Sequence, residues 1–120
     1  MLEKINIGID IVDVSKFKTI PFSNNKSFYT NIFDDDEINY CLKFNDDYRH
    51  FAGKFAIKEA TQKSINIKIP ILNIITSHIE NSPVVKLRNN NDYDFRVSLS
   101  HDQLFTIAVV ISEKINKSIF

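Results

Sequence analysis

The chain has 120 residues, about the length of one domain, of which 43% are hydrophobic and 25% are charged. This composition is typical of a soluble globular protein and excludes an intrinsically disordered chain. Fifteen basic residues balance fifteen acidic residues, so the chain lacks the excess positive charge of non-specific nucleic-acid-binding proteins. We therefore expect a single domain over residues 1–120 and no nucleic-acid partner.

Rare residue types exclude several further classes. The one cysteine, Cys41, excludes an intramolecular disulfide and a cysteine-cluster zinc site, and it favours a reducing compartment. Gly8 and Gly53 are the only glycines, which excludes the glycine-rich loops that bind nucleotide phosphates. The apolar stretches are far shorter than the roughly 20 residues of a transmembrane helix, and residues 1–7 carry no signal-peptide core. These features predict a cytoplasmic protein that does not associate with membranes.

The first half of the chain shows one strand pattern and two helix patterns. Polar residues alternate with isoleucines between residues 4 and 14, which predicts a half-buried strand whose apolar face is formed by Ile5, Ile7, Ile9 and Ile11. A polar stretch follows at residues 21–26. Acidic residues at 34–36 favour a helix start, because the positive end of the helix dipole attracts them. Asp46 or Asp47 can cap a longer helix that runs to about Ser64.

The second half of the chain is rich in strand patterns. After Pro70, residues 69–79 are rich in β-branched residues, and residues 84–88 form a short strand pattern. A turn-like polar run precedes an alternating strand at 93–99, and residues 105–111 form a buried strand pattern. One strand, then helices, then several strands predicts an α+β fold in which the long helix packs on an antiparallel sheet.

Glu59 is the most unusual residue of the long helix. At about 100° per residue it falls near the middle of an apolar stripe made of Tyr48, Phe51, Ala52, Phe55 and Ala56. A carboxylate on a core-facing stripe is costly unless it is paired or binds a cation. Two interpretations follow: Glu59 pairs with Lys63 one turn later, or Glu59 is a metal ligand.

Two further candidates carry weaker local signals. Asp10 lies opposite the isoleucines in a strand, where aspartate is disfavoured, and it is either a solvated residue or a ligand. His101 follows the alternating strand, and it can be a general base, a phosphate contact or a turn residue. His50 and His78 show no informative spacing, and we expect structural roles for them.

Taken together, the motifs around these residues resemble the small 4'-phosphopantetheinyl transferases, the holo-acyl-carrier-protein synthase family. The resemblance covers about residues 5–111 and is carried, in order, by Gly8-Ile9-Asp10-Ile11-Val12-Asp13, Ile32-Phe33 with Glu37, Phe51-Ala52-Gly53-Lys54-Phe55-Ala56-Ile57-Lys58-Glu59-Ala60 and Ser98-Leu99-Ser100-His101-Asp102. It implies a 4'-phosphopantetheinyl transferase-like fold. It also implies transfer of the phosphopantetheine arm of coenzyme A to a serine of apo acyl carrier protein, with release of adenosine 3',5'-bisphosphate, in fatty acid biosynthesis.

The resemblance also implies roles for individual residues. Asp10 and Glu59 would bind Mg²⁺, an ion that proteins usually hold through one or two carboxylates together with substrate phosphates. Lys63 and His101 would contact the coenzyme A phosphates or assist the chemistry, so that all four residues count as catalytic. Either Glu59 or a water molecule would take the serine proton.

The chain departs from the family pattern at several positions of the coenzyme pocket. Lys54 replaces the usual arginine, which keeps the charge and loses the bidentate fork for phosphate. Pro83 ends an Asn-Ser-Pro sequence in place of the usual Gly-Lys-Pro turn, and residues 63–68 replace a glycine-rich segment. By the resemblance, Lys54, Lys63, Pro83 and His101 would bind the coenzyme.

The resemblance further implies two kinds of protein partner. Acidic carrier proteins would dock on lysines near the first helix, namely Lys16, Lys18 and Lys26. The family buries its apolar strands by packing three sheets around a threefold axis, which implies a homotrimer. Asp10, Glu59 and Lys63 would then come from one subunit and His101 from the next. Two alternatives remain at this point: a degenerate relative that binds coenzyme A or carrier protein without turnover, and a purely structural module.

Overall fold

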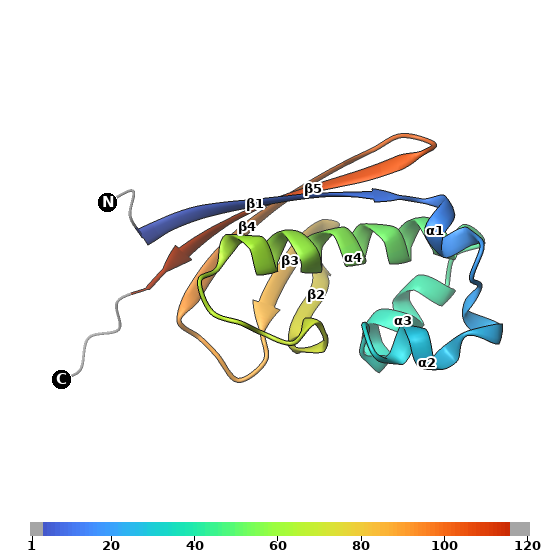
Figure 1. Cartoon of the computed structure of the whole chain (residues 1–120), viewed down its shortest axis with the longest axis horizontal. Coiled ribbons are helices and arrows are strands. Elements are labelled where there is room, and N and C mark those ends of the chain that lie inside the picture. The colour runs from blue at the N-terminus through green and yellow to red at the C-terminus, as the bar shows by residue number, and fades with distance from the viewer. Residues whose placement is uncertain (1–3, 116–120) are drawn as a thin grey trace.

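The computed structural model describes residues 4–115 and has two antiparallel sheets arranged around one long helix (Figure 1). The larger sheet has the strand order β1-β5-β4, formed by β1 (Ile5–Asp13), β5 (Phe105–Lys114) and β4 (Tyr93–His101). The smaller sheet is a hairpin of β2 (Ile74–Ile79) and β3 (Ser82–Leu87). The long helix α4 (Asp47–Ser64) packs on β1 and β5 and also contacts β2. This arrangement confirms the predicted α+β architecture.

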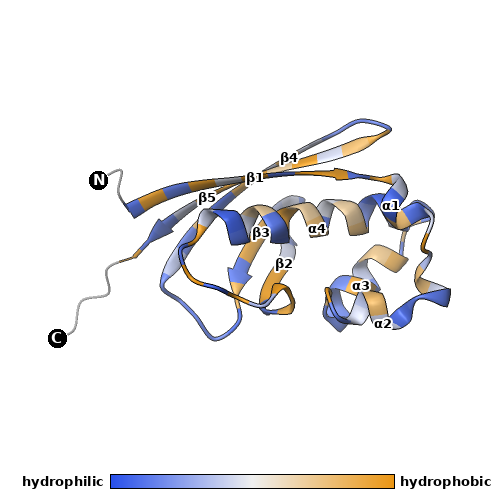
Figure 2. Cartoon of the chain, in the orientation of Figure 1, coloured by the Kyte–Doolittle hydropathy of each residue, from blue (hydrophilic) through white to orange (hydrophobic). Residues whose placement is uncertain are grey.

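In an alternating strand the apolar face is ordinarily the buried one, but in β1 the opposite face is buried. The isoleucine face points to solvent, with Ile7 65%, Ile9 58% and Ile11 58% exposed. The opposite face carries Gly8, Asp10 and Val12 and lies toward α4, where Gly8 and Val12 are buried and Asp10 is half-buried. Figure 2 shows the hydrophobic bands that recur along β1. The prediction of a half-buried strand is confirmed, but the covered face is the one that holds Asp10.

Helix α4 is buried on almost all sides rather than along one stripe. The large sheet covers one side, and α1 (Ser15–Lys18), α3 (Asp35–Leu42) and the β2–β3 hairpin cover others. Its buried residues therefore include the charged Lys54 and Lys58, whereas Glu59 is half-buried. The prediction that the core covers one stripe of α4 with Glu59 in its middle is therefore wrong. Helix periodicity alone does not show how many neighbouring elements cover a helix.

The short helices gather at one end of the molecule, on the right of Figure 1. They comprise α1, the 3-10 helix η2 (Phe22–Asn24), α2 (Lys26–Thr30) and α3. Aromatic side chains hold this end together, since Phe17, Tyr29, Phe33 and Phe51 are all about 1% exposed and lie in contact. Helix α3 starts at the acidic run 34–36, as predicted, and a capping box between Asp34 and Glu37 fixes its N-terminus.

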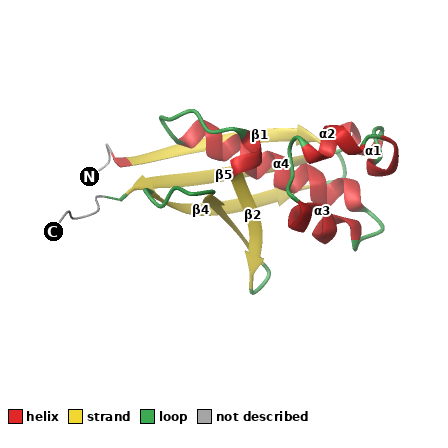
Figure 3. Cartoon of the chain, turned by 90° about the horizontal axis from the view of Figure 1, so that it is seen from below, coloured by secondary structure: helices red, strands yellow, loops and turns green. Residues whose placement is uncertain are grey.

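The β2–β3 hairpin crosses below α4, as the view turned by 90° also shows (Figure 3). Its two-residue turn, Glu80 and Asn81, has φ values of 51° and 68°, which is the conformation of a tight hairpin turn whose twist matches the strands. The β-rich stretch predicted at 69–79 divides into the 3-10 helix η3 (Ile71–Asn73) and β2. No helix within residues 4–115 is long and apolar enough to cross a membrane.

Candidate active site

The close contact between β1 and α4 places Asp10 beside the last turns of the helix. A Cβ atom at Gly8 would overlap the Ala60 carbonyl oxygen and lie 2.8 Å from the Ser64 backbone nitrogen. Only glycine therefore allows the strand to approach the helix this closely. Asp10 is two residues further along the same face of β1, and Glu59 directly precedes Ala60. The backbone contact thus places Asp10 near the part of α4 that carries Glu59.

Lys63, in the last turn of α4, makes a direct contact with Asp10. Its Nζ atom lies 2.9 Å from Asp10 Oδ1 and donates a further hydrogen bond to the Ile9 carbonyl oxygen at 3.2 Å. The alternative of a Glu59–Lys63 ion pair is not found among residues 4–115. Glu59 and Lys63 are one turn apart and therefore neighbours on the helix surface, so Asp10 reaches the same face as both.

The buried charged residues of α4 are Lys54 and Lys58 rather than Glu59. Lys58 Nζ lies 2.9 Å from Glu37 Oε1, and both side chains are at most 1% exposed. Lys58 also donates to the carbonyl oxygens of Ile71 and Ile74, at 3.3 and 2.6 Å. Burial lowers the pKa of Lys58, and the Glu37 carboxylate opposes this effect. The ion pair joins α3, α4 and the start of β2 through one buried contact.

Thr76 extends the same network toward Lys54. Its backbone nitrogen and hydroxyl donate to Glu37 Oε2 at 2.8 and 2.6 Å, and its hydroxyl accepts from Lys54 Nζ at 3.2 Å. Lys54 is 4% exposed, and its Nζ lies 4.7 Å from the centre of the Tyr40 ring. Burial lowers the pKa of Lys54 as well. The lysine that replaces the family arginine is thus held at the junction of α3, α4 and β2.

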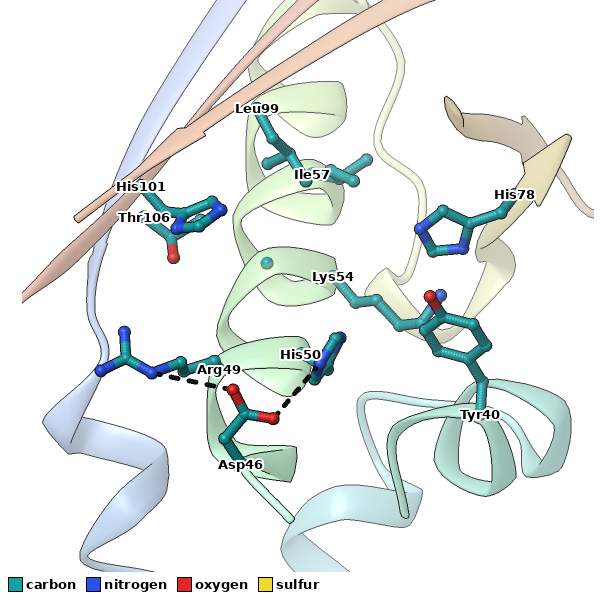
Figure 4. A pocket seen from close by; sticks show the side chains of 11 residues that line it. Tyr40, Asp46, Arg49, His50, Lys54, Ile57, His78, Leu99, His101 and Thr106 are labelled. Carbon is teal, nitrogen blue, oxygen red and sulfur yellow. Dashed lines mark ion pairs between the residues drawn. The ribbon is translucent and has the colours of Figure 1, made fainter. Parts of the chain in front are cut away.

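A pocket of about 250 Å³ lies next to this junction, between α4 and the end of β4 (Figure 4). Its lining includes the basic residues Arg49, His50, Lys54, His78 and His101, and we call it the basic pocket. Asp46 also lines it and lies 4.0 Å from Arg49 and 3.6 Å from His50. His50 stacks on Phe44 with ring centres 3.7 Å apart, and His78 stacks on Tyr40 at 4.7 Å. A concave site with several converging hydrogen-bonding side chains, Lys54 among them, suits a ligand that carries an anionic group.

The two stacked histidines make stability depend on pH. Burial lowers the pKa of both His50 and His78 below the ordinary value of 6.5. The unfolded chain therefore takes up protons near pH 6.5 that the folded chain refuses, and the free energy of unfolding should decrease as the pH falls below that value. Denaturant titrations at pH 7.5 and 5.5 should show this loss in the wild type and a smaller loss in a His50→Gln/His78→Gln variant. Equal losses in both proteins would count against this assignment.

The structure does not bring all predicted site residues together within one chain. Asp10 and Lys63 line a different pocket from His101, beside Ile9, Ile11 and Ile107. His101 ends β4 opposite Thr106, whereas Asp10 lies opposite Ala108 on the other side of β5. Pro83 lies on β3 directly opposite His78, so it adjoins the wall of the basic pocket.

The three lysines predicted to dock the carrier protein share one end of the molecule. Lys16 and Lys18 are exposed on α1, and Lys26 is exposed at the start of α2. Each ammonium group lies over an aromatic ring, at 4.8 Å from Phe55, 5.3 Å from Tyr48 and 6.0 Å from Phe22. These contacts fix the aliphatic stems and leave the charges at the surface.

Sequence reasoning missed the interior half of this site. The Glu37–Lys58–Thr76 network and the stacked pairs of His50 and His78 depend on contacts between segments far apart in the chain. One signal in the sequence could have revealed the network: Lys58 directly precedes Glu59 on a helix that also carries apolar residues away from the predicted stripe.

The fold and these residues match a known family. Residues 6–110 match the family model of the 4'-phosphopantetheinyl transferase superfamily, and the chain belongs to this superfamily. Membership makes it an enzyme of the transferase class, as the motifs of the sequence imply.

Within the superfamily, the similar proteins are holo-[acyl-carrier-protein] synthases. That of Thermodesulfovibrio yellowstonii is 31% identical over 108 residues, which cover 88% of this chain and 95% of the relative. That of Clostridium tetani is 30% identical over 122 residues, which cover 91% and 95%. These matches extend over nearly the whole length of both relatives.

Solved structures of the same class share the fold. The holo-(acyl-carrier-protein) synthase of Bacillus anthracis, in complex with CoA (3',5'-ADP), superposes with a TM-score of 0.78 at 23% identity and covers 92% of this chain and 96% of that chain. The Helicobacter pylori holo-[acyl-carrier-protein] synthase, in complex with coenzyme A, gives a TM-score of 0.73 at 29% identity, with 89% and 99% covered.

Proposed function

We propose that this chain transfers the 4'-phosphopantetheine arm of coenzyme A to a serine hydroxyl of an apo acyl carrier protein and releases adenosine 3',5'-bisphosphate. The observation that carries this proposal is the meeting of Asp10 with the face of α4 that bears Glu59 and Lys63. The names of the similar proteins, and the coenzyme A in the Helicobacter pylori complex, support the same reaction.

Asp10 and Glu59 suit a magnesium ion as the cofactor. Both offer carboxylate oxygens, which are the hard ligands that Mg²⁺ prefers, and Asp10 already attracts a cation in the form of the Lys63 ammonium group. Glu59 makes no ion pair or side-chain hydrogen bond within the described part of the chain. When bound, Mg²⁺ would offset the negative charge of the coenzyme pyrophosphate.

The remaining chemistry is assigned to side chains of this protein. The serine oxygen attacks the phosphorus atom that carries the pantetheine arm, and the bond from that phosphorus to the bridging oxygen breaks. The bridging oxygen leaves with adenosine 3',5'-bisphosphate, while the ammonium group of Lys63 offsets charge on the transferred group. The serine proton passes to the Glu59 carboxylate or to water.

The basic pocket is the proposed site for the nucleotide end of the coenzyme. Its volume of about 250 Å³ accommodates only a part of such a ligand, and Lys54 and His101 provide positive or hydrogen-bonding groups for phosphate. Pro83 would support this site from outside through the neighbouring His78.

The proposal includes a homotrimer whose active sites lie between subunits. The exposed isoleucine face of β1 supports this proposal, because contiguous exposed apolar residues are typical of protein–protein interfaces. Asp10 and His101 line separate pockets in one chain, so a complete site needs the partner subunit's His101 beside Asp10.

Subunit mixing tests this arrangement. Asp10→Ala and His101→Ala should each be inactive alone, because each removes one half of every site. After subunit exchange, a mixture should regain part of the activity, since some interfaces then contain both wild-type residues. Light scattering should give three times the chain mass, and a fully active monomer would rule the arrangement out.

The exposed lysines of α1 and α2 form the proposed docking surface for the acidic carrier protein. Changing Lys16 and Lys26 to glutamate should raise the KM for the carrier protein much more than that for coenzyme A, because repulsion then replaces attraction. The KM for the carrier should also rise with salt in the wild type. Equal effects on both substrates would show that these lysines act elsewhere.

Mass spectrometry tests the proposed reaction itself. An apo carrier protein incubated with coenzyme A, Mg²⁺ and this enzyme should gain the mass of one phosphopantetheinyl group, and a chelator should prevent the gain. Folded enzyme that binds coenzyme A yet modifies none of several carrier proteins would instead support the alternative of a binding protein without turnover.

A further inference from the structure

The ion pair between Lys63 and Asp10 occupies the carboxylate that the proposed function assigns to a metal. Asp10 Oδ1 accepts from Lys63 Nζ at 2.9 Å, and the side chain of Asp10 is only 15% exposed. The ammonium group is further held by the Ile9 carbonyl oxygen at 3.2 Å. A partly buried carboxylate with a single, well-oriented ammonium partner is already compensated electrostatically.

Lys63 differs from Asp10 in how easily it can move. Its side chain is 55% exposed, it lies in the last turn of α4, and it has no acidic partner besides Asp10 among residues 4–115. Asp10, in contrast, is fixed on β1 between its neighbours in the β1–β5 ladder. Rearrangement at this site therefore means movement of the lysine, which is a flexible point charge on a four-carbon stem.

We propose that Lys63 and the metal ion compete for Asp10, so that Lys63 acts as a placeholder cation until an anionic substrate draws it away. A divalent cation at Asp10 Oδ1 would meet the ammonium group at close range, and the two positive charges would repel each other. The pyrophosphate of the coenzyme provides a second anion to which Lys63 can turn. This inference rests on the proposed function, and it predicts weak metal binding without coenzyme and tighter binding with it.

Manganese binding in the absence of coenzyme tests the competition directly. Mn²⁺ is the probe, and electron paramagnetic resonance counts the free ion. Lys63→Gln should bind Mn²⁺ about fivefold to tenfold more tightly than the wild type, because the competing partner of a partly exposed ion pair is gone. Lys68→Gln is the matched control: it removes the same charge from an exposed lysine four residues beyond the end of α4. It should change the affinity by less than about twofold.

Two further variants make the outcome unambiguous. Asp10→Asn/Lys63→Gln should lose the gained affinity, which locates the ion at Asp10. Lys63→Arg, which keeps a charged partner for Asp10, should bind Mn²⁺ as weakly as the wild type. If Lys63→Gln binds no more tightly than Lys68→Gln, or if Asp10→Asn leaves the gain intact, the inference is wrong.

Coenzyme A added to the same samples separates this inference from the proposed function. It should raise the Mn²⁺ affinity of the wild type more than that of Lys63→Gln, because only the wild type has a competing lysine to release. If Lys63→Gln binds Mn²⁺ more tightly than the wild type, but the wild type never modifies a carrier protein, the proposed function is overturned and the competition stands. If the wild type transfers the arm but Lys63→Gln and Lys68→Gln bind Mn²⁺ equally well, the proposed function stands and the competition is overturned.

Discussion

Replacing Lys58 with methionine should lower the free energy of unfolding by about 3–5 kcal/mol, because Glu37 would then remain as an unpaired charge in the core. Glu37 is 1% exposed and is shielded from water that could solvate its charge. Its other partners, the backbone nitrogens of Asp34 and Thr76 and the Thr76 hydroxyl, carry no full positive charge. Urea denaturation followed by circular dichroism measures the loss.

A second variant isolates the ion pair from the change in packing. Glu37→Gln/Lys58→Met leaves no charge to compensate, so it should be more stable than Lys58→Met alone. If the effects of the two single changes simply add in the double variant, the pair contributes no coupling and the explanation fails. Transfer activity of the double variant, if it is folded, shows whether the Glu37–Lys58 ion pair also positions the basic pocket.

Changing Gly8 to alanine should cost at least about 1–3 kcal/mol, because the new methyl group would overlap backbone atoms of α4 that cannot rotate away. The helix must shift relative to β1, and Asp10 would then lie out of place with respect to Glu59 and Lys63. A displacement of about 1 Å at a reacting centre can reduce the rate on the order of 100-fold, so turnover should fall far more than stability alone explains.

Gly53→Ala is the matched control for this change. A Cβ atom at Gly53 would lie 3.7 Å from Leu99 Cδ1, which is an ordinary contact, and alanine favours the helix by about 1 kcal/mol over glycine. The melting temperature should therefore stay the same or rise. A stable and active Gly8→Ala protein would show that the strand and helix can separate without harm to the site.

Local periodicity was sufficient to predict the long elements. The alternating residues before Val14, the acidic start of α3 and the run to Ser64 correspond to β1, α3 and α4 with small shifts of their ends. Local patterns did not predict the short helices α1 and α2, since four or five residues carry too little periodicity, and only the resemblance implied a first helix near Lys16, Lys18 and Lys26. Their positions depend on packing of Phe17 and Tyr29 against α4, which no local pattern records.

The orientation of β1 shows a second limit of sequence patterns. Alternation separates two faces of a strand, but it does not say which face a helix covers. Gly8 decides this in the structure, because only the glycine side allows α4 to approach. The isoleucines are left exposed, which agrees with the expected surplus of apolar strand surface.

The sequence motifs predicted the candidate site residues on β1 and α4, but not the contacts in the interior. Asp10 and Lys63 are in contact, and Glu59 lies one turn before Lys63 on α4, but their roles stay predictions. Glu37 and Thr76 are 39 residues apart in sequence, so their hydrogen bonds follow only from the fold. The same holds for the stacking of His78 on Tyr40 and of His50 on Phe44. Both histidines line the basic pocket.

The transfer rate of the two carboxylate variants tests the central claim most directly. Mass spectrometry of an apo carrier protein would compare the wild type with Asp10→Ala and Glu59→Ala at saturating Mg²⁺, after circular dichroism has shown that each variant is folded. We expect the wild type to modify the carrier serine completely, and each variant to modify almost none of it in the same time. A Glu59→Ala enzyme with a near wild-type rate would contradict the assignment of the β1–α4 edge as the catalytic centre.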